Sequence, residues 1–285
     1  MNGILVIDKP KNLTSRDVVN EISRYFKTKK VGHTGTLDPL ATGVLVICLG
    51  SYTKISELLV ATDKEYEAEF IFGKLTDTLD ITGNVIKEEE AIFSKEEIRK
   101  ALQKMIGIYN QEVPIYSAVK VNGKKLYEYA RNNEEVVLPK HEVNIKELEL
   151  LDIQYNNNKT VIKVRCLVSK GTYIRALGND IARKLNSIAI MSNLRRTKQG
   201  KFTLKDSYKL EDVLDGKYEL LNVEDVLDYH KVEIPANLKE KIKNGAIIDN
   251  IYNEEYILFT ENKKAKAIYK IYSKDITKLK PWKML

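Results

Sequence analysis

Residues 31–50 read VGHTGTLDPLATGVLVICLG, a loop rich in glycine and threonine that leads directly into an apolar run. The run VLVICL predicts a buried strand, which would anchor the loop in the core. Pro39 disfavours helical backbone at Asp38 and narrows the directions in which the Asp38 carboxylate can point. Anchoring of this kind is typical of a loop that presents a reactive group, although an ordinary Asp-Pro turn would show the same pattern.

The length of 285 residues suits one large domain, or a large domain followed by a small one. No apolar run is long enough to cross a bilayer, and the opening MNGILVIDKP fits neither a signal peptide nor a membrane span. Cys48 and Cys166 lie in apolar runs without CxxC spacing. The three histidines, His33, His141 and His230, show no metal-ligand spacing. We therefore expect a cytoplasmic protein without a disulfide or a metal site.

The chain carries 47 basic and 40 acidic residues, which gives a formal net charge of +7. A positive charge is expected of a protein that binds a polyanion such as nucleic acid. Much of the excess is lysine, however, and a solvated lysine-rich surface explains it equally well. Composition alone therefore does not identify a partner.

The pattern of apolar residues gives a coarse order of elements. Residues 160–168 alternate apolar with charged side chains, which predicts a strand with one buried face. Ser94 and Glu97 form a capping box ahead of a helix, and Thr14 or Ser15 caps an earlier one. Strands are expected at 3–8, 44–49, 66–72, 143–153 and 160–168, and helices after residue 15, after residue 94, at 126–131 and at 174–185. This order lacks regular βαβ alternation and predicts an α/β fold with a mixed, largely antiparallel sheet.

The charge pattern changes after about residue 229, where the chain becomes rich in lysine. Short strand candidates follow at 256–259 and 265–272, and KNG at 243–245 is a turn signal. We therefore expect a division into residues 1–229 and a small, basic, β-rich module at 230–285.

Six stretches of the chain stand in a recognisable order and spacing. They are DKPKNLTS at 8–15, KVGHTGTLDPLATGVLVICLG at 30–50, KEYEAEFIFGKLTDTLDITG at 64–83, QEVPIYSAVKVNGKKLYEYAR at 111–131, SKGTYIRALGNDI at 169–181 and LRRTKQG at 194–200. Together they resemble the B-type family of bacterial tRNA pseudouridine-55 synthases. The resemblance implies a pseudouridine synthase catalytic domain, followed by a PUA-like, β-barrel-like module that binds the tRNA acceptor stem.

The same resemblance implies an isomerase that converts uridine 55 in the T loop of tRNA to pseudouridine. Such an enzyme is expected to need no cofactor, no guide RNA and no partner protein, to work away from membranes and to act as a monomer. It is also expected to flip the target nucleotide out of its loop, because the glycosidic bond is unreachable in a stacked base.

The resemblance assigns the chemistry to particular residues. It makes Asp38 the nucleophile and Arg175 the cation that pairs with it. It places Tyr66 against the flipped uracil, and makes Tyr173 and Leu194 parts of the pocket. Taken alone, Tyr66 fits core packing and Arg175 fits an exposed helix start, so these roles depend on the resemblance.

His33 matches a histidine implicated in opening the RNA loop, although a lone histidine is more often structural. Basic residues in or beside the six stretches are candidates for phosphate contacts: Lys9, Lys11, Lys120, Lys124, Lys125 and Arg131. Each of them also fits a solvated surface residue. Asn12 replaces the family's usual glycine after DKPK, and because asparagine tolerates left-handed backbone, the turn can survive the change.

Three other functions fit parts of the pattern. They are an RNA-folding protein that remodels tRNA, a guide-dependent RNA modifier, and an aspartate-dependent N-glycosidase that releases free uracil. The intact Asp38 and Arg175 argue against lost catalysis, and the compact C-terminal module argues against dependence on a guide.

Overall fold

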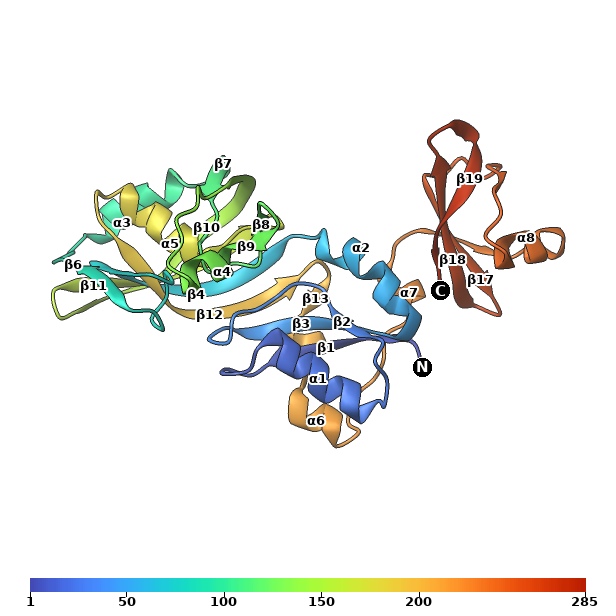
Figure 1. Cartoon of the computed structure of the whole chain (residues 1–285), viewed down its shortest axis with the longest axis horizontal. Helices are drawn as coiled ribbons and strands as arrows, with labels where there is room; N and C mark the ends of the chain where they lie inside the picture. Colours follow the sequence, from blue (N-terminus) through green and yellow to red (C-terminus); the bar gives the residue numbers. More distant parts are fainter.

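The main sheet of the protein has ten strands, and the computed structural model describes all 285 residues. The path of the sheet runs through β14 (Tyr208–Lys209), β1 (Gly3–Lys9), β3 (Thr42–Leu49), β12 (Ala189–Gln199), β4 (Lys64–Phe72), β11 (Lys159–Val168), β10 (Lys140–Asn156) and β7 (Gly107–Glu112), with β2 (Val31–His33) beside β3 and β13 (Phe202–Thr203) beside β12. Figure 1 shows that this sheet spans the larger part of the molecule.

Two pairs of neighbouring strands in this sheet are parallel, β1 with β14 and β3 with β12. The other pairs are antiparallel, including the long ladders of β4 with β11 and β12. The predicted α/β fold with a mixed, largely antiparallel sheet is therefore confirmed.

Short helices and 3-10 turns connect the strands along the chain. They are α1 (Ser15–Tyr25), α2 (Ser56–Val60), α3 (Lys95–Gln103), α4 (Leu126–Arg131), α5 (Ile174–Arg183), α6 (Leu210–Leu214), α7 (Val223–Val226) and α8 (Lys239–Lys243), with 3-10 turns η1 (Gly50–Ile55), η2 (Leu204–Asp206) and η3 (Ala236–Leu238). Both predicted caps are confirmed, because Thr14 caps α1 and Ser94 forms a capping box with Glu97 at α3. None of the helices combines the length and the apolar character needed to cross a membrane.

The strand β3 is buried on both of its faces, as its unbroken apolar sequence predicts. Leu45 and Ile47 belong to the larger hydrophobic core, which lies between the sheet and α1, α3 and α5. Val44 and Val46, on the opposite face, belong to a second core. The loop that ends at β3 is therefore attached to one of the most rigid parts of the molecule.

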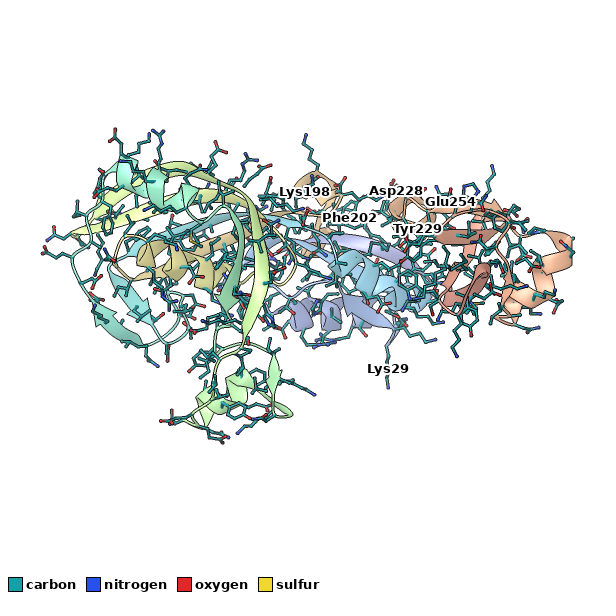
Figure 2. The ribbon with its side chains drawn as sticks, turned by 90° about the horizontal axis from the view of Figure 1, so that it is seen from above. Lys29, Lys198, Phe202, Asp228, Tyr229 and Glu254 are labelled. Carbon is teal, nitrogen blue, oxygen red and sulfur yellow. The ribbon has the colours of Figure 1, made fainter.

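Two small hairpins lie outside the main sheet. One joins β5 (Lys74–Thr76) to β6 (Val85–Glu88), and the other joins β8 (Lys120–Val121) to β9 (Lys124–Lys125). In Figure 2 the green segment with β8, β9 and α4 projects from the body of the molecule. We call this segment, residues 115–133, the projecting unit.

The C-terminal part of the chain forms a second, five-stranded sheet. Its order is β15 (His230–Glu233), β17 (Tyr256–Glu261), β18 (Lys264–Tyr272), β19 (Asp275–Met284) and β16 (Ile248–Asp249). Figure 1 shows it at the opposite end of the long axis from α3 and α5. Leu258 and Ile268 of this sheet belong to the second core together with Val44 and Val46. The turn η1 and the helix α7 also contribute to this core and contact β19 and β18, so they join the C-terminal sheet to the rest of the molecule.

Candidate active site

The residues on either side of Asp38 are tied to the start of the chain. The Ser15 hydroxyl donates to the Leu37 carbonyl at 3.1 Å and accepts from the Leu37 N–H at 2.8 Å. The Asn12 N–H donates to the Pro39 carbonyl at 2.8 Å. Asn12 has a φ of 70°, so the expected left-handed turn is present despite the missing glycine. The backbone of Asp38 is thus fixed from both sides.

Lys9 lies beneath this loop and is fully buried. Its ammonium donates to the carbonyls of Leu13 at 2.6 Å and Pro10 at 2.8 Å. Burial lowers the pKa of Lys9 to about 8, an effect that the nearby Asp38 carboxylate partly opposes. The structure contradicts the predicted phosphate contact for Lys9, because a buried ammonium bonded to backbone carbonyls cannot reach an RNA phosphate. The residue instead supports the loop.

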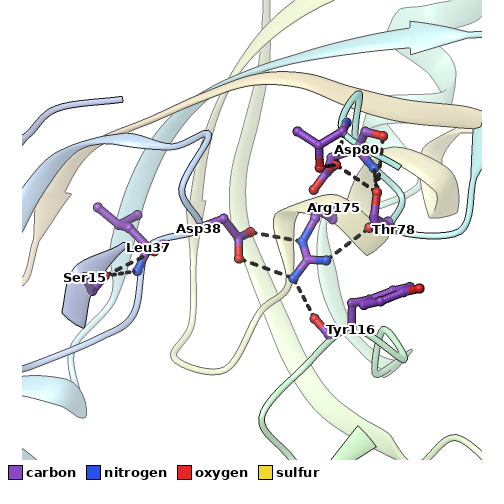
Figure 3. A network of polar contacts seen from close by, with 8 residues as sticks. Ser15, Leu37, Asp38, Thr78, Asp80, Tyr116 and Arg175 are labelled. Atoms are coloured by element: carbon purple, nitrogen blue, oxygen red, sulfur yellow. Dashed lines mark hydrogen bonds and ion pairs between the residues drawn. The ribbon is translucent and has the colours of Figure 1, made fainter. Parts of the chain in front are cut away.

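Asp38 and Arg175 form an ion pair with two contacts (Figure 3). Nε of Arg175 lies 3.0 Å from Oδ2 of Asp38, and Nη2 lies 3.4 Å from Oδ1. The guanidinium also donates to the carbonyls of Thr78 and Tyr116, both at 3.0 Å. Arg175 is 8% exposed and stands in the first turn of α5, where the helix dipole disfavours a cation. The carboxylate of Asp38 offsets that penalty.

The turn that carries Thr78 is held by the buried Asp80. Its Oδ1 accepts from the Thr78 hydroxyl at 2.8 Å, and from the N–H and hydroxyl of Thr82 at 2.9 and 2.6 Å. Figure 3 shows this group directly beside the guanidinium of Arg175. The turn is therefore stiff enough to hold the Thr78 carbonyl against Arg175.

A cavity of about 390 Å³ opens in front of the Asp38 carboxylate. Its lining includes Asp38, Tyr66, Tyr173, Arg175 and Leu194. These five residues come from four different segments of the chain, because Tyr173 and Arg175 both lie at the start of α5. The sequence analysis assigned all of them to one pocket. The structure brings them together.

Tyr66 forms the floor of this cavity on β4. It is 7% exposed, and burial raises the pKa of its phenol, so the hydroxyl keeps its proton. On β12, Arg196 is its cross-strand partner, and Leu194 lies two residues before Arg196. An aromatic ring beside an apolar wall forms a surface that suits the flat face of a base.

Arg196 also lines the cavity, and the sequence analysis did not identify it. It is 1% exposed and donates to the carbonyls of Val44 at 2.7 Å and Gly35 at 3.0 Å. It therefore holds the two ends of the Asp38 loop. Gly43, with a φ of 102°, lets β12 approach, since a β-carbon there would lie 2.2 Å from the Arg196 carbonyl oxygen. Arg196 lies in the stretch LRRTKQG, but nothing in that stretch distinguishes the buried Arg196 from the less buried Arg195 and the exposed Lys198.

Lys64 and Lys170 are two further cations on the cavity wall. Lys64 donates to the carbonyls of Val60 at 2.7 Å and Thr62 at 2.6 Å. Burial, with a smaller contribution from the charge of Arg196, lowers its pKa to about 8. With Arg175 and Arg196, these lysines give the cavity four cationic side chains against the single carboxylate of Asp38. Such a cavity attracts a polyanion.

His33 lies on β2, outside this cavity, and its Nδ1 accepts from the Gly35 N–H at 3.3 Å. Burial lowers the pKa of His33, and the charges of Arg16 and Arg196 add to that effect, so the ring is neutral at pH 7. Its position on the surface of the Asp38 loop leaves the predicted RNA contact as a hypothesis.

The remaining predicted RNA contacts lie at or near the surface. Lys11 and Lys120 are exposed. Lys124 pairs with Glu134 at 2.6 Å. Lys125 and Arg131 flank the ring of Tyr127, which also lines the cavity. The projecting unit thus carries four of the predicted cations, next to the mouth of the pocket.

No group of three or more His, Cys, Asp or Glu side chains in the structure is arranged to hold a metal ion. Cys48 and Cys166 are free and buried, and burial raises the pKa of each thiol to about 12. Neither thiol is poised to react.

Comparison with known proteins gives consistent matches. The family model described as "TruB family pseudouridylate synthase (N terminal domain)" matches residues 23–174, and "tRNA pseudouridylate synthase B C-terminal domain" matches residues 175–231. The tRNA pseudouridine synthase B of Staphylococcus aureus strain MSSA476 is 40% identical, over 99% of each chain. That of Caldanaerobacter subterraneus subsp. tengcongensis is 44% identical, over 90% of this chain and 89% of its own.

Two solved structures share the fold. The structure of an H/ACA RNP bound to a substrate RNA containing 2'-deoxyuridine matches 99% of this chain and 84% of its own, with a TM-score of 0.71 and 22% identity. A Cbf5-Nop10-Gar1 complex matches 99% and 83%, with a TM-score of 0.70 and 23% identity. At this identity the likeness shows the fold alone.

Proposed function

Because this chain belongs to the TruB family of pseudouridylate synthases and is a tRNA pseudouridine synthase, we propose that it converts uridine 55 of the T loop, with Asp38 as nucleophile. The observation that carries the proposal is the ion pair of Asp38 with Arg175, at the wall of a cavity of about 390 Å³ whose floor is Tyr66. Since the substrate is tRNA, we also infer that the enzyme acts in the cytoplasm.

The reaction is an isomerisation and needs no co-reactant. The bond between N1 of uracil and C1′ of ribose breaks, and Asp38 forms a temporary covalent bond to the substrate. A new bond between C5 and C1′ then forms and the bond to Asp38 is released. C5 loses a proton and N1 gains one, so the atoms balance. Arg175 orients the carboxylate for attack and partly neutralises its charge at the wall of the pocket.

Tyr66, Tyr173 and Leu194 hold the detached base in this proposal. Stacking of a base on an aromatic ring contributes roughly 1–3 kcal/mol and does not prevent the base from rotating in its plane. Rotation is required here because C5 must replace N1 opposite C1′. The flat floor and the apolar wall suit that motion.

The cations of the cavity and of the projecting unit would bind the RNA backbone. We propose Lys11, Lys120, Lys124, Lys125 and Arg131 as phosphate contacts, and His33 as a contact to the opened loop. Residues 1–229 would form the catalytic domain, and residues 230–285 a PUA-like module for the acceptor stem. The start of the second sheet at His230 supports that boundary.

We further propose that the enzyme works as a monomer, without a guide RNA or a partner protein. The structural neighbours, from an H/ACA RNP and from a Cbf5-Nop10-Gar1 complex, are longer chains, of which this one covers 84% and 83%. The curated relatives, in contrast, correspond to this chain over nearly their whole length.

Site-resolved pseudouridine mapping tests the proposal on an unmodified tRNA transcript, with wild type beside Asp38→Asn. We expect one new pseudouridine in the T loop with wild type and none with the variant. Product on the bare transcript would exclude a need for a guide. Free uracil instead of pseudouridine would indicate an N-glycosidase, and binding without any product would indicate an RNA-folding protein.

A further inference from the structure

We propose that Gln111 is a positioning residue for catalysis, which holds the first turn of α5 so that Arg175 meets Asp38. The inference rests on the proposed roles of Asp38 and Arg175. Gln111 contacts neither of them and acts through the backbone of Tyr173.

The side-chain amide of Gln111 bonds to both polar groups of one backbone residue. Gln111 lies on β7 and is 1% exposed. Its Oε1 accepts from the Tyr173 N–H at 2.8 Å, and its Nε2 donates to the Tyr173 carbonyl at 3.2 Å. This orientation of the amide is fixed, because a backbone N–H can only donate. A buried amide with two matched backbone partners is a strong geometric constraint.

The first turn of α5 lacks the usual local stabilisation. Tyr173 is the N-cap, but its side chain makes no capping bond, and the first turn contains no acidic residue. Arg175 instead places a cation at the positive end of the helix dipole. An element from elsewhere must therefore hold this turn, and Gln111 on β7 does so. Since Arg175 follows Tyr173 by two residues, a shift of the Tyr173 backbone would move the guanidinium.

A second contact fixes the same helix further along. Nε2 of Gln111 also donates to the Tyr109 hydroxyl at 2.8 Å, and that hydroxyl donates to Oδ2 of Asp180 at 3.0 Å. Asp180 belongs to α5, so β7 holds the helix at its start and again near its end. Two points of attachment restrict both the rotation of α5 and its sliding along β7. Gln111 takes part in both.

The first test is Gln111→Met, which keeps the length of the side chain and removes its amide. Loss of a buried hydrogen-bonding partner should lower the single-turnover rate of pseudouridine formation by about 10- to 100-fold. The affinity for tRNA should change by less than about twofold, because Gln111 lies outside the cavity. Gln154→Met, at an exposed amide on β10, is the matched control and should keep the wild-type rate.

The second test, Gln111→Glu, keeps the shape and shows whether the amide or merely the packing matters. An ionised glutamate accepts from Tyr173 but cannot donate to its carbonyl, whereas a protonated one offers the same donor and acceptor as glutamine. The groups around it are Tyr109 and Glu112 on β7, Asp180 and Arg183 on α5, and His141 on β10. Burial and the neighbouring carboxylates favour the protonated form.

The rate of Gln111→Glu, divided by the wild-type rate, should therefore rise as the pH is lowered from about 8 to about 6. A residue that only supports the fold would lower the melting temperature without this recovery. Such a result, or a Gln111→Met rate within twofold of wild type beside an inactive Asp38→Asn, would overturn the inference alone. Turnover by Asp38→Asn would overturn the proposed function and the inference with it.

Discussion

Gly178 on α5 lies directly against the ring of Phe70 on β4, where a β-carbon would stand 2.4 Å from Cδ1 of Phe70. Phe70 is fully buried, so its ring has no space to withdraw. The contact sets the distance between the helix that carries Arg175 and the strand that carries Tyr66. The two halves of the proposed active site are thus spaced by a glycine that takes no part in the chemistry.

Gly178→Ala should therefore destabilise the protein, although alanine is preferred to glycine in a free helix by about 1 kcal/mol. Overpacking of a closed core costs about 1–3 kcal/mol, and after subtraction of the helix preference we expect a net loss of up to about 2 kcal/mol in the free energy of unfolding. Urea denaturation measures it. The double variant with Phe70→Leu should recover part of the loss, and an unchanged loss in that background would contradict the steric explanation.

Arg175→Lys should lower the single-turnover rate by about 100-fold or more while tRNA affinity stays close to wild type. Lysine keeps the charge but lacks the planar fork that reaches Asp38 and two backbone carbonyls together. Arg165→Lys, at an arginine paired with surface glutamates, is the matched control. Equal loss of affinity and rate would show that Arg175 binds the RNA and does not orient the carboxylate.

The lowered pKa of Lys64 should make the free energy of unfolding depend on pH in the alkaline range. Because this pKa is about 8 in the folded protein and 10.5 ordinarily, the unfolded chain holds more protons between these two values. The free energy of unfolding therefore rises with pH in that window, by at most about 1.4 kcal/mol per pH unit from this group. Lys64→Met should lack that rise. Denaturation curves at several pH values test it, and parallel behaviour of the two proteins would contradict the lowered pKa.

Affinity for tRNA should fall steeply with salt. The five proposed phosphate contacts imply a loss of about 50- to 140-fold between about 0.1 and 0.3 M monovalent salt. Lys120→Gln, on the projecting unit, removes one proposed phosphate contact. It should therefore make the slope of log affinity against log salt shallower by about one unit. Lys95→Gln, at the exposed start of α3, should leave it unchanged. A flat response of the wild type would refute binding through the basic cavity.

The sequence predicted those parts of the molecule whose causes are local. The caps of α1 and α3 depend on residues three positions apart, and the left-handed turn at Asn12 depends on one residue. The burial of β3 follows from its own apolar run. The five pocket residues were assigned through the family resemblance, because no local pattern connects Asp38 with Arg175.

Residues whose burial depends on distant segments were missed or misassigned. Lys9, Lys64 and Arg196 have the appearance of solvated cations in the sequence, yet each is buried. Their partners are backbone carbonyls, which leave no trace in the side-chain pattern. The strand β12 escaped detection for a related reason, since its charged residues interrupt the apolar alternation. A buried cation is recognisable only once the fold supplies its acceptors.

The second core, which contains Leu258 and Ile268 of the C-terminal sheet as well as Val44 and Val46 of β3, has a consequence for the proposed substrate selection. Because one hydrophobic cluster includes both the C-terminal sheet and the strand that anchors the Asp38 loop, the two ends of the enzyme keep a constant separation. An RNA that binds to both ends must then have a distance between its two contact regions that matches this fixed separation. If the proposed acceptor-stem contact holds, molecules whose T loop lies too near to or too far from their stem would be rejected by geometry, before any base is read.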